Sequence, residues 1–125
     1  MNRNHHLICL PHHAEKIIDG TKTTTIRTPR KHAVAVGDTI TFAIWKGVPF
    51  RSKQERVRVV TVTSVDQIYV NRQTRGIRLN GHLQRAFIAQ HIAEVDGFLG
   101  LWELIDYLTS DKQPEFSGFI YGWEA

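Results

Sequence analysis

Residues Gly20 to Arg27, "GTKTTTIR", follow a short helical pattern and begin a strand. The stretch 11–19 before them predicts a helix, because its first residue is a proline, which suits a first helical turn, and Gly20 stands where a helix-ending glycine belongs. The β-branched residues of 23–27 favour extended backbone. We therefore expect a helix–turn–strand unit in which two cations, Lys22 and Arg27, flank a row of hydroxyl groups.

The alternation of side chains along a strand predicts which of these groups meet. Thr24 and Ile26 share one face, and the isoleucine marks that face as buried. Thr25 and Arg27 then border solvent or a cavity, and Lys22 can reach over Thr25 from the preceding turn. A desolvated lysine beside an arginine has a lowered pKa and could take the threonine proton, while the arginine holds an anion or a carbonyl oxygen. The alternative is a solvated strand edge without chemistry.

Length and composition predict one compact domain over residues 1–125, since 42% hydrophobic residues suffice for a core. A single cysteine, Cys9, excludes an internal disulfide framework, and the N-terminal residues resemble neither a signal peptide nor a membrane span. We expect a cytoplasmic domain without membrane contact. The net charge of +4 permits partners that carry phosphate. Basic residues gather in 27–32, 46–58 and 72–85, and acidic residues gather later in the chain.

The rest of the chain predicts an α+β fold. Leu83, Phe87, Ile88 and Ile92 fit one apolar helical face, residues 98–108 show a second helical period, and Asp96-Gly97 breaks the two helices apart. Trp102 and Trp123 lie on apolar periods and are expected in the core. The alternating or β-branched stretches follow one another without long crossovers, which favours a mainly antiparallel curled β-barrel of about six strands with helices packed outside. The stretches expected to form strands are 5–10, 23–27, 39–45, 55–65, 67–70, 76–81 and 116–123.

"HHAEKIIDGTKTTTIR" followed by "VGDTITF" resembles the ASCH family, a branch of the PUA-like superfamily. The family carries a helix ending in glycine, a Gly-x-Lys-x-x-Thr-x-Arg signature and a Gly-Asp turn into a strand. "IAEVDGFLGLWELIDYL" resembles a second landmark, with a Trp-containing helix, and "FSGFIYGW" resembles the last strand. The matching positions of the first motif are Gly20, Lys22, Thr25, Arg27, Gly37 and Asp38.

The resemblance implies a PUA-like β-barrel whose cleft binds RNA, DNA or a modified nucleoside. The sequence is also similar to the small bacterial amidohydrolases that remove the acetyl group from 4-acetylcytidine. Carried over residue by residue, their catalytic lysine and threonine fall on Lys22 and Thr25, and their proton donor falls on Asp96, with Glu94 as a rival. The family's acid is a glutamate, so Asp96 departs from the pattern by one methylene.

Further candidates surround these three. Arg27, Thr23, Trp45 and Glu94 are expected to contact the substrate. His5, His6, His12 and His13 lack the spacing of a metal site, so we expect neither metal nor cofactor, and one of these histidines is expected near the mouth of the cleft. A phosphate-binding role is predicted for the cations Arg30, Lys31, Lys46, Lys53, Arg72, Arg75 and Arg78. The alternative for the arginines of 72–78 is a solvated basic loop.

Three functions follow from these residues. The first is an amidohydrolase that acts on acylated cytidine through Lys22 and Thr25. The second is a binding module that holds RNA or DNA in the same cleft without chemistry. The third is a ribonuclease or other nuclease, in which Lys22 and the surrounding cations act on a phosphodiester.

Overall fold

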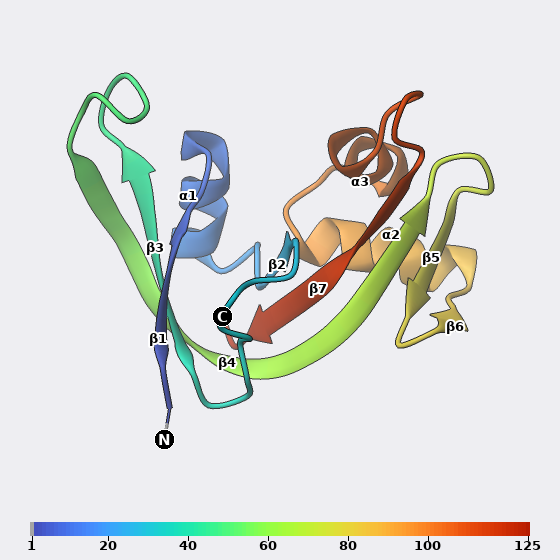
Figure 1. The fold of residues 1–125 in the computed structure, drawn as a ribbon, viewed down its shortest axis with the longest axis horizontal. Helices are drawn as coiled ribbons and strands as arrows, with labels where there is room; N and C mark the ends of the chain where they lie inside the picture. Colours follow the sequence, from blue (N-terminus) through green and yellow to red (C-terminus); the bar gives the residue numbers. More distant parts are fainter. Residues whose placement is uncertain (1) are drawn as a thin grey trace.

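The computed structural model describes residues 2–125, which form seven strands and three helices (Figure 1). Their bounds, in chain order, are β1 (Asn4–Ile8), α1 (Pro11–Asp19), β2 (Thr24–Arg27), β3 (Thr39–Trp45), β4 (Gln54–Asn71), β5 (Gly76–Leu79), β6 (His82–Leu83), α2 (Ala86–Val95), α3 (Leu101–Leu108) and β7 (Glu115–Trp123). The helix–turn–strand unit predicted from Gly20–Arg27 is present. Gly20 ends α1 with φ of 85°, a left-handed conformation that glycine adopts at little cost.

The long strand β4 joins two segments that the sequence suggested were separate strands. Asp66 lies between them, yet it pairs with Ile120 of β7 and its carboxylate accepts a hydrogen bond of 2.8 Å from Asn80. The acidic residue is therefore accommodated at the sheet surface. Figure 1 shows β4 curving beneath the molecule, and irregularities in its pairing with β3 and β7 accompany the bend.

The sheet is mainly antiparallel and strongly curved, as expected, but it is not a closed barrel. β3 pairs with the first half of β4, whereas β7 and β5 pair with its second half. β1 runs parallel to β3, and every other pairing is antiparallel. Within residues 2–125, β1 pairs with β3 alone, β2 with β7 alone and β6 with β5 alone, so three strand edges stay open.

Two hydrophobic clusters hold the fold together. The first packs α1 against β1, β3, the middle of β4 and the end of β7, and the second packs α2 and α3 against β2, β5, the end of β4 and the preceding part of β7. Two expectations about these helices are wrong. The buried side of α2 consists of Ala89, Ile92 and Ala93, while Phe87 is exposed, because the small alanines let the helix lie close to the sheet. Trp102 is 46% exposed, although Trp123 is buried.

Candidate functional site

A cavity of about 320 Å³ lies at the open edge of β2, between the end of β1, the start of α1 and the turn that joins α2 to α3. We call it the Lys22 cavity. Its polar lining comes from Lys22, Thr25, Arg27, Asp96 and His13. The remaining side chains of its lining are mostly apolar or aromatic, and they include Ile8, Leu10, Tyr107, Leu108 and Phe116. Residues that are 74 positions apart in the chain thus meet at one concave site.

Lys22 follows the left-handed turn at Gly20, and this turn directs the lysine inward. Only 2% of the residue is exposed. Its Nζ donates a hydrogen bond of 2.5 Å to the main-chain oxygen of Asp96 and lies 3.5 Å from the Asp96 Oδ2. Burial lowers the pKa of the Lys22 amine, and the neighbouring Asp96 partly opposes this shift. The lysine therefore loses its proton more readily than an exposed lysine does.

Asp96 caps the C-terminus of α2 and faces the lysine. It is 3% exposed, and its Oδ1 accepts a hydrogen bond of 2.7 Å from the Thr24 hydroxyl. Burial raises the pKa of the Asp96 carboxyl to about 6, against the opposing effects of Lys22 and Thr24. Gly97 follows with φ of 94°, and a Cβ there would lie 3.2 Å from the Lys22 Cδ, so a glycine makes room for the lysine stem.

Thr25 and Arg27 form the neighbouring wall. The Arg27 Nε donates to the Thr25 Oγ1 at 3.2 Å, and its Nη2 donates to the main-chain oxygen of Ile8 at 3.0 Å. Thr25 is buried because β1 and α1 cover its side of the strand, whereas the sequence pattern alone left solvent as an alternative. Burial also lowers the pKa of the Arg27 guanidinium. The arginine connects β2 to β1 across the cavity.

His13 is the histidine that lies in this cavity. It projects from the first turn of α1, and its ring meets Phe98 edge-on at a centroid distance of 5.3 Å. Burial, with Lys22 nearby, lowers the pKa of His13 to about 4, so the imidazole is neutral at neutral pH. Tyr107, which is largely exposed, lies 6.2 Å from His13 between ring centroids. The sequence named His13 only as one of four histidines, of which one was expected near the mouth of the cleft, and it did not name Tyr107. The contact between α1 and α3 shows which of the four lines the cavity.

His5, in contrast, contacts a buried carboxylate away from the cavity, and this contact is structural. The Nε2 of His5 lies 2.9 Å from the Asp38 Oδ2. Main-chain N–H groups of Arg3 and Ala35, together with His5, lower the pKa of Asp38 to about 2. This cluster fixes the turn before β3. Within residues 2–125, no group of three or more His, Cys, Asp or Glu side chains is placed to hold a metal ion.

Three residues predicted to contact substrate lie outside the lining of the Lys22 cavity. Glu94 is exposed on α2, so Asp96 is the carboxylate that faces the lysine. The main-chain N–H of Thr23 donates a hydrogen bond to the oxygen of Val95, and its main-chain oxygen accepts one from the N–H of Trp123. Trp45 ends β3 and packs against Phe50 in the following loop, with ring centroids 5.2 Å apart.

The predicted phosphate-binding cations lie in separate places. Lys46 and Lys53 occupy the β3–β4 hairpin, which Figure 1 places at the opposite end of the molecule from the β4–β5 hairpin. Arg72 is paired with Asp106 at 2.6 Å and with Asp111 at 3.4 Å. The guanidinium carbon of Arg75 lies 4.2 Å from the ring centroid of Trp102. Arg30, Lys31 and Arg78 are exposed and line hollows close to β1 and β7.

Comparison with known proteins finds a solved structure with a similar fold. The crystal structure of ASCH from Zymomonas mobilis matches this chain with a TM-score of 0.55, over 98% of this chain and 67% of that one. This chain has the ASCH fold. The two sequences are 16% identical, so the match concerns the arrangement of strands and helices. No family model and no curated protein matches the sequence.

The ASCH fold agrees with the resemblance seen in the sequence, and in this chain both motifs lie beside one cavity. The first motif supplies Lys22, Thr25 and Arg27, and the second supplies Asp96. No helix within residues 2–125 is long and apolar enough to cross a membrane.

Proposed function

We propose that the Lys22 cavity of this ASCH-fold chain binds a single nucleobase, presented by RNA, by DNA or as a free modified nucleoside. The observation that carries the proposal is the buried Lys22–Asp96 pair, which opens onto a cavity together with Thr25 and Arg27. Buried charges are costly unless they have partners, and a cavity lined by them suits a small polar ligand. A volume of about 320 Å³ lies at the small end of ligand sites.

The hydrogen-bonding groups of the cavity complement the edge of a cytosine-like base. The carboxylate of Asp96 can accept a hydrogen bond from an exocyclic amine. Lys22 and Arg27 are donors for a ring carbonyl oxygen, and the neutral ring of His13 offers either a donor or an acceptor. Tyr107 and Phe116 provide aromatic surface for the base plane. The lining therefore contains both the donors and the acceptors that recognition of such a base needs.

A second candidate, hydrolysis of the acyl amide of 4-acetylcytidine, is favoured by the pKa of Asp96, which at about 6 suits a proton donor near neutral pH. In this mechanism the neutral Lys22 amine removes the Thr25 proton, and the threonine oxygen attacks the acyl carbon. Arg27 stabilises the oxyanion. The carbon–nitrogen bond then breaks, Asp96 protonates the departing amine of cytidine, and water hydrolyses the acyl-threonine to acetate. Since Lys22 now faces Asp96, its amine must turn toward Thr25 in the first step.

The experiment separates binding from chemistry. Isothermal titration measures the binding of cytidine, 4-acetylcytidine and a short RNA, and chromatography follows deacetylation of the acetylated nucleoside. We expect Thr25→Val to abolish turnover and to retain binding, because valine keeps the shape of threonine without the hydroxyl. Thr23→Val is the matched control, since Thr23 does not line the cavity. Lys22→Met should lose both activities.

Each candidate has its own contradicting result. Turnover by Thr25→Val at the parental rate would exclude the threonine nucleophile and leave base binding intact. Failure of the parent protein to bind any of the three ligands, or unchanged binding by Lys22→Met, would contradict the proposed cavity function itself.

A further inference from the structure

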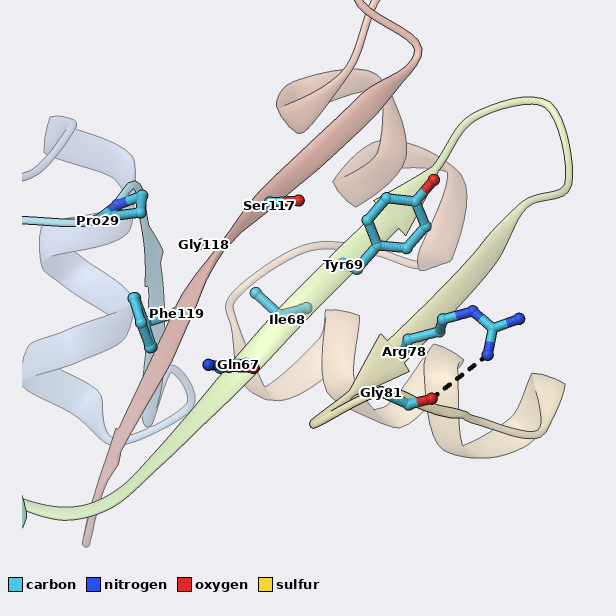
Figure 2. A pocket seen from close by; sticks show the side chains of 9 residues that line it. All are labelled: Pro29, Gln67, Ile68, Tyr69, Arg78, Gly81, Ser117, Gly118 and Phe119. Atoms are coloured by element: carbon cyan, nitrogen blue, oxygen red, sulfur yellow. Dashed lines mark hydrogen bonds between the residues drawn. The ribbon is translucent and has the colours of Figure 1, made fainter.

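A second hollow lies on a part of the sheet face that the helices leave uncovered, and Phe119 at its border is half-buried because it also packs against the first hydrophobic cluster. The volume of this hollow is about 380 Å³ (Figure 2). On β4, Ile68 and Val70 point to the opposite face, where they pack in the cluster that contains α2 and α3. The alternation along the strands therefore places the intervening side chains on the open face. We call this site the sheet-face hollow. The side chains on this face that line it are Gln67, Tyr69, Arg78, Ser117 and Phe119.

The pairing register brings an arginine and two aromatic rings together on this face. Tyr69 is the cross-strand partner of both Arg78 and Ser117, and Gln67 is the partner of Phe119. Tyr69 and Phe119 are thus diagonal neighbours, which places their Cα atoms about 7–8 Å apart. Figure 2 shows the side chains of Tyr69, Arg78 and Phe119 spread over β7, β4 and β5, with the helices behind the strands.

Tyr69 is held in position by its hydroxyl group, which donates to Glu115 and accepts a hydrogen bond of 3.0 Å from the Asn71 amide. The hydroxyl is therefore occupied, and the ring remains as the surface that Tyr69 offers to a ligand. Arg78 has one hydrogen bond, of 3.4 Å, to the main-chain oxygen of Gly81. Its guanidinium retains further N–H groups for a phosphate.

A third hollow connects the sheet-face hollow to the Lys22 cavity. Pro29 lines both the sheet-face hollow and a hollow of about 630 Å³ beside β1, and Thr28 lines both the latter and the Lys22 cavity. In addition, Arg27 of the Lys22 cavity is the cross-strand partner of Phe119. The three hollows therefore follow the chain segment 27–29 in order.

The charge of this path suits a polyanion. The hollow beside β1 is lined by Arg3, Arg30 and Lys31, and the sheet-face hollow is lined by Arg78. Among the described residues that line these two hollows, none is acidic. Aromatic rings on an open sheet next to arginines are the combination that binds unstacked bases and their phosphates.

We propose that the sheet-face hollow is a second base-binding site, which stacks a neighbouring base of the same single-stranded nucleic acid on Tyr69 and Phe119. The backbone of that strand passes the cations beside β1, and Arg78 contacts a phosphate. This inference rests on the proposed function, in which the first base enters the Lys22 cavity. It specifies a polynucleotide as the physiological ligand.

A length series of oligocytidylates tests the second site. Fluorescence anisotropy and titration compare the mononucleotide with chains up to an octamer, as RNA and as DNA. We expect affinity to rise with length. Tyr69→Leu and Phe119→Leu should each lower the affinity for the octamer by about 5-fold to 150-fold, which corresponds to weakened stacking of the one base that lies on both rings. Neither change should alter the affinity for cytidine.

Two further variants test separately the aromatic ring of Tyr69 and the positive charge of Arg78. Tyr69→Phe keeps the ring and should bind the octamer nearly as well as the parent. Arg78→Gln should reduce the slope of log affinity against log salt by about 0.7, as expected for one lost contact to single-stranded phosphate. Phe87→Leu and Arg51→Gln are the matched controls, because both residues are exposed and neither lines one of the three hollows. Circular dichroism verifies the folding of every variant.

The two proposals fail in different ways. An octamer that binds no more tightly than the mononucleotide, or Tyr69→Leu and Phe119→Leu variants that bind the octamer like the controls, would overturn the second site. A parent protein that does not bind cytidine, while its octamer affinity still depends on Tyr69, would overturn the cavity function and support the sheet-face site. A photocrosslink from a 4-thiouridine-substituted octamer to Tyr69 or Phe119 would support the second site directly.

Discussion

Replacing Lys22 with methionine tests whether Lys22 and Asp96 stabilise each other inside the fold. Methionine keeps most of the lysine stem and removes the amine. Asp96, which is 3% exposed, then retains the Thr24 hydroxyl as its side-chain partner. Removal of one member of a buried ion pair costs about 3–5 kcal/mol. Because a domain of this size has a free energy of unfolding of about 5–15 kcal/mol, the loss is a large part of the total.

The loss depends on pH, because Asp96 can take up a proton. Burial raises the pKa of Asp96 from 3.8 to about 6 even with Lys22 beside it, so removal of the lysine raises this pKa further. A raised pKa in the folded protein favours folding at low pH, and this contribution is lost as the pH rises through the folded pKa. We expect Lys22→Met to cost more near pH 8 than near pH 5, by about 1.4 kcal/mol for each unit of further increase.

Urea denaturation followed by tryptophan fluorescence measures these energies in a double-mutant cycle with Asp96→Asn. We expect the double variant to be more stable than the sum of the single losses predicts, because both buried charges are then absent. Lys31→Met is the control for the loss of an exposed lysine. Additive losses, or a Lys22→Met loss that is the same near pH 5 and near pH 8, would refute the coupling.

Two further predictions concern the surroundings of the cavity. Gly118→Ala should destabilise the protein by about 1–3 kcal/mol, because a Cβ at this position would lie 2.3 Å from the main-chain oxygen of Arg27. Gly47→Ala, whose Cβ would lie 3.4 Å from its nearest neighbour, is the control in the same urea assay, and equal losses would contradict the prediction. The depressed pKa of Asp38, about 2, stabilises the fold above its ordinary value of 3.8, and this contribution is lost as the pH falls toward 2. Asp38→Asn should therefore flatten the decrease of the urea midpoint with acid, and a slope equal to that of the parent would show that Asp38 does not cause it.

Local chemistry accounts for the parts of the fold that the sequence predicted. The helix 11–19, its glycine end and the strand 39–45 depend on proline, glycine and alternation within a few residues, and all three are present. The continuity of β4 depends on Asp66 meeting Ile120 and Asn80, which are distant in the chain. The open sheet depends likewise on which strand edges pair, and no local pattern determines that.

The same division holds for the site. A period of two correctly indicated that Thr25 and Arg27 lie on one side of β2, since the arginine donates to the threonine. The contact between Lys22 and Asp96 joins residues 74 positions apart, and it was anticipated only through the family resemblance. Arg78 was predicted from the sequence as a phosphate-binding cation, and His13 was one of four candidate histidines. The placement of Tyr69 and Phe119 on the same sheet face depends on the pairing of β4 with β7, which no local pattern determines.

A purely structural role for the Lys22–Asp96 pair explains less than a ligand-binding role. The two residues do connect β2 to the turn between α2 and α3, but an apolar pair would connect them at a lower cost in desolvation. Burial shifts the pKa of Lys22 down and the pKa of Asp96 up, so it disfavours the charged form of both groups. Such shifts are concentrated at functional sites, where a polar ligand completes the hydrogen bonding. A variant that combines Lys22→Met with Asp96→Leu should therefore approach or exceed the stability of the parent and bind no cytidine. A double variant that binds cytidine with parental affinity would leave the pair without a role in recognition.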